Sequence, residues 1–149
     1  MDRKLLLRII PLFLSLFALV TCPAAVIQVS NTNDAGAGSF RQAVLDAASG
    51  DTITFSILTN LSTIVLTGGE VAVDKDLYID GNGTALTTLS GDNANRILNI
   101  SGNSDVIVNG VTFINGSTTT NGGAILTTSS QLELLNCSTL PGEALFWTM

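Results

Sequence analysis

Histidine is missing from this chain of 149 residues, and charged side chains are few, at 12% of the total. Without histidine, neither a His-ligated metal site nor a Ser-His-Asp triad can be built. Six basic residues face twelve acidic ones, and the pI near 4.2 excludes the clustered basic surface of a nucleic-acid-binding protein. The low charge and the 46% apolar content also argue against intrinsic disorder, so the chain is expected to fold.

The longest apolar run lies near the N-terminus and has the layout of a secretory signal peptide. Three basic residues among the first eight precede an apolar run over residues 9–20, and Ala24 and Ala25 follow it. This run is shorter than the roughly 20 residues needed to span a bilayer. We predict export with cleavage near Ala25, which makes residues 1–25 a signal peptide. An uncleaved anchor and lipoprotein-type processing at Cys22 are the alternatives.

The remainder of the chain, residues 26–149, is poor in both charge and cysteine. It holds three basic residues against eleven acidic ones, a net charge of −8, and Cys137 is its single cysteine. An intrachain disulfide is therefore excluded there. Thr, Asn, Ser and Gly together supply 55 of these 124 residues. Because Asn, Gly and Ser are typical of turns and Thr favours strands, we expect many short strands joined by tight turns.

One helix is predicted, over residues 39–49. Ser39 occupies the N-cap position and Gln42 follows three residues later, which is the capping-box pattern. Gly50 is expected to end the helix as a C-cap. The helix should dock on the rest of the fold through one small apolar face, formed by Phe40, Ala43, Val44 and Ala47 or Ala48.

Short strands are expected along the rest of the chain, separated for the most part by turns rich in Gly and Asn. The expected strands after the helix cover residues 51–55, 62–66, 71–73, 77–79, 96–100, 106–108, 111–114, 124–126 and 132–134.

Three of these strands share one pattern. Residues 77–81 read L-x-I-x-G, residues 106–110 read V-x-V-x-G, and residues 132–136 read L-x-L-x-N, with starts 29 and 26 residues apart. Self-similarity at such a period indicates a solenoid. Strands and turns repeating at about 27 residues fit a parallel β-helix with about three short strands per coil and coils stacked about 4.8 Å apart. A β-sandwich of hairpins is the alternative, because short strands occur in both.

Several segments resemble those of exported bacterial right-handed parallel β-helix proteins. The N-terminal cap of those proteins has the pattern N-T-N-D-x-G-x-G-S-x-R-Q-A followed by G-D-T-I-x-F. This chain is similar to the first part over residues 29–47 and to the second at residues 50–55, which read G-D-T-I-T-F. Residues 77–83 resemble the L-x-I-D-G-N-G turn of that family. G-G-A-I at residues 122–125 and L-x-L-x-N-C-S at residues 132–138 resemble the repeats of polymorphic outer membrane proteins, whose other element, F-x-x-N, is absent.

The resemblance covers about residues 27–139 and implies a right-handed parallel β-helix of about four to five coils with one N-terminal capping helix. It also implies a secreted or surface-exposed protein, often one involved in adhesion. We accordingly assign residues 26–50 to an N-terminal strand and the capping helix, residues 51–140 to the coils, and residues 141–149 to an atypical tail. Because no coil pattern follows Leu140, we expect either a fragment of a longer protein or a tail that folds back as a crude plug.

Few residues are candidates for a catalytic or ion-binding role. Polysaccharide lyases and hydrolases built on parallel β-helices use clustered carboxylates with Ca²⁺, an acid/base pair or a basic side chain. Here the candidates are Asp74, Asp76 and Asp80 with Lys75. The pattern favours a structural role for these residues. Asp-Lys-Asp at residues 74–76 is expected to form a polar corner, and Asp80 is expected to accept a hydrogen bond from its own backbone in a turn. Asp80 and Asn82 are spaced like two ligands of a Ca²⁺ loop, but the further ligands of such a loop are missing from the sequence. We therefore predict no catalytic, cofactor-binding or metal-binding residues and no cofactor.

Two residues near the end of the repeat carry structural expectations. Asn136 should stack with side-chain amides of neighbouring coils, and Cys137 should behave as a small buried apolar residue. Five N-x-S/T sequons occur, and in a bacterial product we expect them to go unused.

Two functions are left open by the sequence. The favoured one is a non-enzymatic, secreted or outer-membrane-associated protein whose Thr, Asn and Ser surface serves adhesion or structural display, with cell-surface molecules or glycans as partners. The alternative is a fragment of a carbohydrate-active β-helix enzyme, a polysaccharide lyase or hydrolase. Three cations and no histidine are a poor supply of catalytic bases. If the repeat is interrupted at Leu140, the final coil leaves unpaired strand edges around Leu132, Leu134 and residues 124–126, which predict self-association through the open C-terminal coil.

Overall fold

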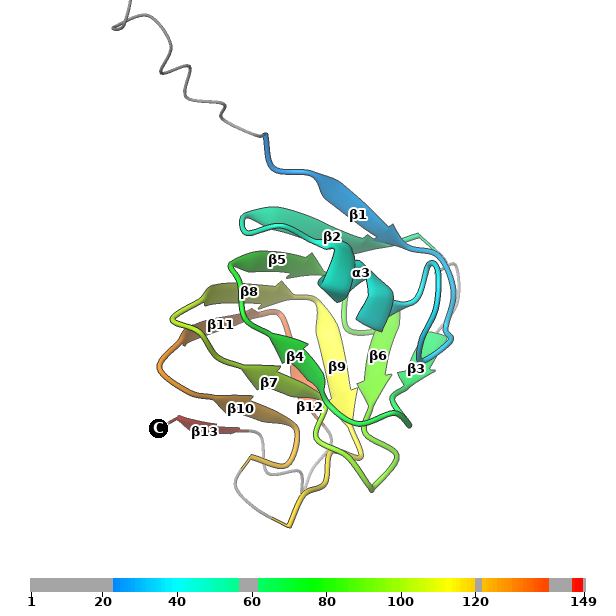
Figure 1. The fold of residues 1–149 in the computed structure, drawn as a ribbon. Helices are drawn as coiled ribbons and strands as arrows, with labels where there is room; N and C mark the ends of the chain where they lie inside the picture. The colour runs from blue at the N-terminus through cyan, green and yellow to red at the C-terminus, as the bar shows by residue number, and fades with distance from the viewer. Residues whose placement is uncertain (1–22, 57–61, 120–121, 140–145, 149) are drawn as a thin grey trace, which may run out of the picture.

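Parallel strands build almost the whole of the computed structural model, which describes residues 23–56, 62–119, 122–139 and 146–148 (Figure 1). One short helix lies at the end of the molecule where β1 and β2 are found. In chain order the elements are β1 (Val26–Val29), α3 (Phe40–Asp46), β2 (Asp51–Phe55), β3 (Ser62–Val65), β4 (Val71–Val73), β5 (Leu77–Asp80), β6 (Thr87–Ser90), β7 (Leu98–Ile100), β8 (Asp105–Asn109), β9 (Val111–Ile114), β10 (Ile125–Thr127), β11 (Gln131–Leu135), β12 (Ser138–Thr139) and β13 (Phe146–Thr148).

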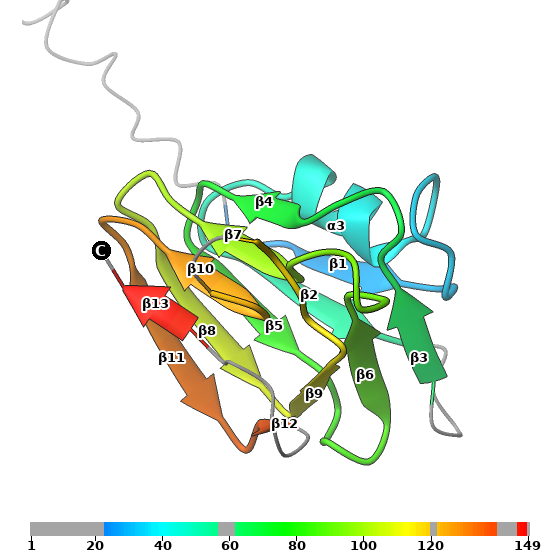
Figure 2. The same ribbon diagram turned by 90° about the horizontal axis from the view of Figure 1, so that it is seen from below.

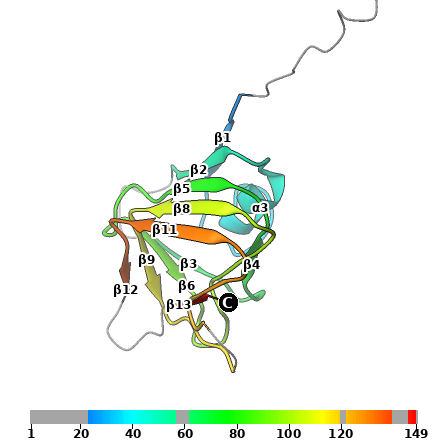
Figure 3. The ribbon, with the colours of Figure 1, turned by 90° about the vertical axis from the view of Figure 1, so that its left-hand side faces the viewer.

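The strands form three sheets that run along the length of the molecule. Sheet 1 has the order β1-β2-β5-β8-β11, sheet 2 the order β3-β6-β9-β12, and sheet 3 the order β4-β7-β10-β13. Figure 3 shows the strands of sheet 1 stacked one below another, and Figure 2 shows the other two sheets beside it. Each turn of the chain adds one strand to each sheet, which gives a β-solenoid of about four turns. The predicted parallel β-helix is confirmed, and the hairpin sandwich is wrong because every described strand pair is parallel.

The register of sheet 1 follows the sequence repeat. Leu77 pairs with Val106, and Val106 pairs with Leu132, so the three strands that share the pattern lie in line. The coils differ in length by a few residues, and the turns absorb that difference while the strands keep their alignment. The predicted alignment of the coils is confirmed.

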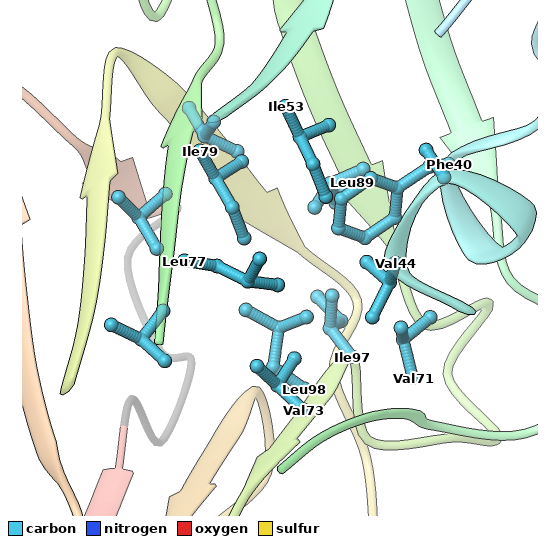
Figure 4. Packing of buried hydrophobic residues seen from close by; sticks show 14 of the residues in the cluster. Phe40, Val44, Ile53, Val71, Val73, Leu77, Ile79, Leu89, Ile97 and Leu98 are labelled. Carbon is cyan, nitrogen blue, oxygen red and sulfur yellow. The ribbon is translucent and has the colours of Figure 1, made fainter. Parts of the chain in front are cut away.

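Alternate residues of each strand point into the solenoid and stack on their equivalents in the neighbouring coils. In sheet 1 one such column contains Ile53, Ile79 and Val108, all at 0% exposure. Figure 4 shows Ile53 and Ile79 in one hydrophobic cluster with buried side chains of the helix and of the other two sheets. Since a fully buried aliphatic side chain contributes about 1.5–3 kcal/mol, these columns are the main source of stability.

The helix closes the interior beside β1 and β2. Ser39 is its N-cap, as predicted, and the Ser39 hydroxyl accepts the N–H of Gln42 at 3.1 Å. The capping box is only half formed, because the Gln42 side chain donates to Asp46 instead of reaching back. On the buried face, the Phe40 ring lies 5.7 Å from the ring of Phe55. The apolar face uses Ala47 and leaves Ala48 exposed.

The helix ends earlier than predicted, with Ala47 as the C-cap in an extended conformation. The Asp51 carboxylate accepts the N–H of Ala48 at 2.8 Å, and the Lys75 ammonium donates to the carbonyl of Ala47 at 3.0 Å. These contacts satisfy the polar groups near the helix end from outside the helix. Gly50, predicted as the C-cap, instead lies in the turn to β2 with a φ of +91°.

Strand β6 was not predicted from the sequence. Its four residues, Thr-Thr-Leu-Ser, include only Leu89 as a large apolar side chain. Thr87 and Leu89 nevertheless point inward at 0% exposure, because β6 lies between β3 and β9 and must follow their register.

The C-terminal tail also supplies a strand that no repeat pattern marks. Backbone pairing places β13 in parallel beside β10, with Phe146 opposite Ile125 and Trp147 opposite Leu126. This is the position that a strand of the fourth coil takes in sheet 3. The signal peptide predicted for residues 1–25 lies almost wholly outside the described residues, so export stays a prediction.

Candidate functional site

The corner between β4 and β5 holds three of the four candidate catalytic residues. Asp74 is exposed, and its carboxylate lies 3.9 Å from the Lys75 ammonium. Lys75 donates to the carbonyls of Ala47 and Val44 at 3.0 and 3.4 Å, so its charge lies at the C-terminal end of α3. A cation at this end interacts favourably with the helix dipole. Lys75 is thus a helix-capping residue, and the predicted polar corner is what the structure shows.

The Asp76 carboxylate joins its corner to the coils on either side. One oxygen accepts the backbone N–H of Asp105 at 2.8 Å, and the other accepts the hydroxyl of Ser49 at 3.0 Å. These two hydrogen bonds, the backbone one above all, hold the pKa of Asp76 below its usual range. A carboxyl group that stays ionised in this way is a poor proton donor at neutral pH.

Asp80 lies at the far end of β5 from Asp76, in the turn toward β6. Its carboxylate accepts the backbone N–H of Asn82 at 3.3 Å, as the turn interpretation predicted. The same oxygen accepts the side-chain amide of Asn109 at 3.2 Å, and Asn136 donates its own amide to Asn109 at 2.9 Å. The predicted amide stacking of Asn136 is therefore part of a ladder across three coils. The structure does not bring the candidate carboxylates into one cluster.

The turn after Asp80 also explains why glycine follows it. A Cβ atom on Gly81 would lie 2.5 Å from the carbonyl oxygen of Gly110 in the next coil. The coils approach too closely at this corner for any side chain, so the spacing between coils depends on Gly81.

A polar cluster that the sequence reasoning missed lies where sheet 2 passes into sheet 3. Arg96, 9% exposed, forms an ion pair with the carboxylate of Glu70, one coil earlier. Its Nε donates to the carbonyl of Gly122, one coil later, at 2.8 Å. Asn99 donates to the second oxygen of Glu70 at 2.7 Å. The signal was present as the spacing of 26 residues between Glu70 and Arg96, which equals one coil.

Arg41 extends this cluster to the N-terminal cap. Its guanidinium donates to the carbonyls of Gly69 and Glu70 and pairs with Asp34 at 2.7 Å. Burial by itself would raise the pKa of Asp34. Hydrogen bonds from Arg41 and from the backbone N–H of Gly68, together with the positive charge of Arg41, outweigh it and leave the pKa of Asp34 lowered.

The structure therefore uses each basic side chain of the described residues as a structural contact. Arg41 holds the cap, Lys75 the end of α3, and Arg96 the corner between coils. No group of three or more acidic, Cys or His side chains in the described ranges lies close enough to hold a metal ion. Cys137 is a half-buried free thiol packed against the core, with its sulfur 3.3 Å from the carbonyl of Val108.

A surface depression lies at the corner before β8 and β11. It is open, has a volume of about 410 Å³ and is lined by polar side chains. It contains none of the four candidate catalytic residues. The residues that line it are Asn103, Asp105, Ser129, Ser130 and Gln131.

The outer face of sheet 2 carries a regular hydroxyl ladder. Thr63, Thr88, Thr112 and Ser138 pair in register, one from each coil, and point away from the core. Stacked coils place such equivalent side chains about 4.8 Å apart. This hydroxyl ladder forms an uncharged stripe along the solenoid.

No family model, curated protein or solved structure matches this chain. Within the described residues, no helix is long and apolar enough to cross a membrane.

Proposed function

We propose that the chain is a non-enzymatic β-solenoid that displays a polar, ribbed surface for adhesion or structural display. The observation that carries this proposal is the structural use of Arg41, Lys75 and Arg96, each of which donates to backbone carbonyls. These are the basic side chains of the described residues that could otherwise act as a catalytic base or bind an acidic polysaccharide. The hydroxyl ladder supports the same proposal, because it offers one hydroxyl group per coil in a repeating geometry. The partners we propose are cell-surface molecules or glycans.

The cellular setting belongs to the same proposal. The basic and apolar pattern of residues 1–25 supports export, and the cap and coil motifs support a place among secreted or outer-membrane proteins of the polymorphic repeat type. The solenoid of about four turns is consistent with such a protein.

Binding to cells tests the display function. Fluorescent beads coated with the purified chain should adhere to cells or to an array of neutral glycans, and a variant with Thr88→Glu and Thr112→Glu should lose that adhesion. Ile107→Glu on the outer face of sheet 1 is the control, since it adds charge to a different face. Equal adhesion by all three proteins, or none by the unaltered chain, would refute display through the hydroxyl ladder.

Turnover tests the alternative of a polysaccharide lyase or hydrolase. The chain is incubated with uronate-containing and neutral polysaccharides in the presence and absence of Ca²⁺, and unsaturated products and new reducing ends are measured. We expect neither product. Turnover that disappears with Asp76→Asn or Asp80→Asn would overturn the non-enzymatic proposal.

A further inference from the structure

We propose that this chain associates head to tail, with β11 of one copy pairing in parallel with β1 of a second copy. The proposal concerns the two ends of the solenoid and is independent of what its sides display. It identifies the surface that receives the C-terminal coil, and it makes the contact heterologous, so that the assembly grows as an open series.

The two edges of sheet 1 are complementary. Among the described residues, β1 has a partner strand on one side only, β2, and β11 has a partner on one side only, β8. All five strands run in the same direction, so a second copy displaced along the solenoid axis presents β1 to β11 as the next parallel strand. An edge with unpaired N–H and C=O groups is a template for this kind of pairing.

Burial of the inward column differs between the inner coils and the outermost coil of the described residues. Ile79 and Val108 are fully buried, whereas Leu134, which continues the same column, is only half-buried. Leu132 is likewise half-buried, although Leu77 in the equivalent position is 3% exposed. Covering these two leucines would remove further apolar surface from water, at about 25 cal/mol per Å².

Exposed apolar side chains are also found at the ends of the solenoid. Four large apolar residues stand out as exposed in the described part of the chain, and none lies on an inner strand. The four are Val26 on β1 (68% exposed), Leu45 on α3 (65%), Val65 on β3 (37%) and Leu135 on β11 (37%).

The existing register predicts which residues would meet. Glu133 stands in the column that begins with Val26, and Leu134 stands in the column that begins with Ile27. Continuing that register into a second copy places Ile27 beside Leu134 and Val26 beside Glu133. A tail-to-tail pair of β11 strands, centred on its middle residue, would instead place two Glu133 carboxylates directly opposite each other, which is unfavourable.

The association should be weak and reversible. One added strand pair buries much less than the roughly 1,200 Å² of a stable interface. We therefore expect the sedimentation coefficient of the purified chain to rise steadily with concentration, without reaching a fixed oligomer.

Variants that block one edge each provide the decisive test. The carbonyls of Ala25 and Val29 accept hydrogen bonds from backbone N–H groups in and just after β2. Because backbone polar groups of successive residues in a strand point to opposite sides, the N–H of Gln28 faces the free edge. Gln28→Pro removes this N–H without breaking the hydrogen bonds between β1 and β2. At the other end, Leu134→Lys places a charge on the open coil, where the long side chain can reach water. Val26→Glu is a second variant of the β1 edge, because it would place a carboxylate directly beside Glu133 of the second copy. Ile107→Lys on the inner strand β8 is the control.

Each edge variant alone should remain monomeric at concentrations where the unaltered chain and Ile107→Lys associate. A mixture of Gln28→Pro with Leu134→Lys should form a one-to-one dimer and nothing larger, because one partner keeps a free β11 and the other keeps a free β1. Three outcomes would overturn the proposal: an unaltered chain that stays monomeric, dimerisation of folded Gln28→Pro or Val26→Glu on its own, or a mixture that does not dimerise.

Discussion

Arg96 in the second coil forms an ion pair with Glu70 in the first, and its guanidinium also donates to the carbonyl of Gly122 in the third. One side chain thus joins three successive coils at the corner between sheet 2 and sheet 3. Arg41 donates to the backbone carbonyl of Glu70, so the same cluster reaches the N-terminal cap. Like the hydrogen bonds of Asp76 and the ladder from Asp80 to Asn136, this corner adds polar contacts to strand pairing and apolar stacking, and these contacts depend on the exact stacking of the coils.

Replacing Arg96 by methionine should destabilise the fold by about 2 kcal/mol, since the Glu70 carboxylate loses its ion pair and keeps only the Asn99 amide, and the Gly122 carbonyl loses the Arg96 donor. Denaturant unfolding measures the loss. Glu70→Gln should cost less because Glu70 is partly exposed, and the double variant should cost less than the sum of the two single changes. Strict additivity would show that the pair contributes no coupling.

Between neutral and acid pH, stability should fall only in the acid range. Hydrogen bonds from backbone N–H groups lower the pKa of Asp51 and Asp76, and the pKa of Asp34 is also lowered. A carboxyl group with a lowered folded pKa contributes stability above its unfolded pKa of about 3.9, and that stability is lost as the pH falls through the folded pKa. Melting temperatures should therefore change little from about pH 7 to about pH 5 and fall below about pH 4. A steep change near pH 6 would contradict this, since the chain has no histidine.

Neighbouring residues on β8 should differ strongly in how much the same substitution destabilises the fold. Val108→Asp buries an unpaired charge in the fully buried column and should cost several kcal/mol, enough to unfold the domain. Ile107→Asp, on the half-buried outer face of the same strand, should cost less, about 1–2 kcal/mol, part of it because the new carboxylate lies opposite Glu133. Thermal melting of both variants decides the matter, and similar losses would mean that β8 does not have the assigned inner and outer faces.

Lys75→Met should destabilise the cap modestly, by about 0.5–1 kcal/mol, because α3 loses the cation at its C-terminal end. Asp74→Asn, which alters the exposed neighbour of Lys75, should be close to neutral. Hydrogen exchange of the helix amides would locate the effect, and faster exchange confined to residues distant from α3 would rule out a capping role.

The sequence repeat predicted the coils well because their register rests on inward aliphatic side chains. Leu77, Val106 and Leu132 are visible as a pattern, and the strands that carry them align as the pattern requires. Strand β6 carries no such pattern, since Thr87 is buried by the strands on either side of it and not by its own hydrophobicity. The end of α3 was misplaced for a similar reason, because Lys75, 28 residues beyond Ala47, helps to fix it.

The polar contacts were harder to predict than the strands. Asp80 was identified correctly as a turn residue, since its partner Asn82 is only two residues away. Glu70 and Arg96 were overlooked because their contact depends on coil length, which the turns vary from one coil to the next. Local signals in the sequence therefore indicated local contacts, and contacts between coils required the register of the solenoid.

Cross-linking of outward-facing residues in adjacent coils tests the stacked parallel solenoid most directly. In a background with Cys22→Ser and Cys137→Ser, the pair Tyr78→Cys and Ile107→Cys should form a disulfide under mild oxidation, because the two positions are register partners in parallel strands about 4.8 Å apart. Tyr78→Cys with Asn109→Cys should not, since that diagonal separation exceeds the roughly 7 Å limit for a disulfide. Mass spectrometry of tryptic peptides reads out both pairs. A cross-link in the second pair alone, or in neither, would contradict the stacking of coils on which the account rests.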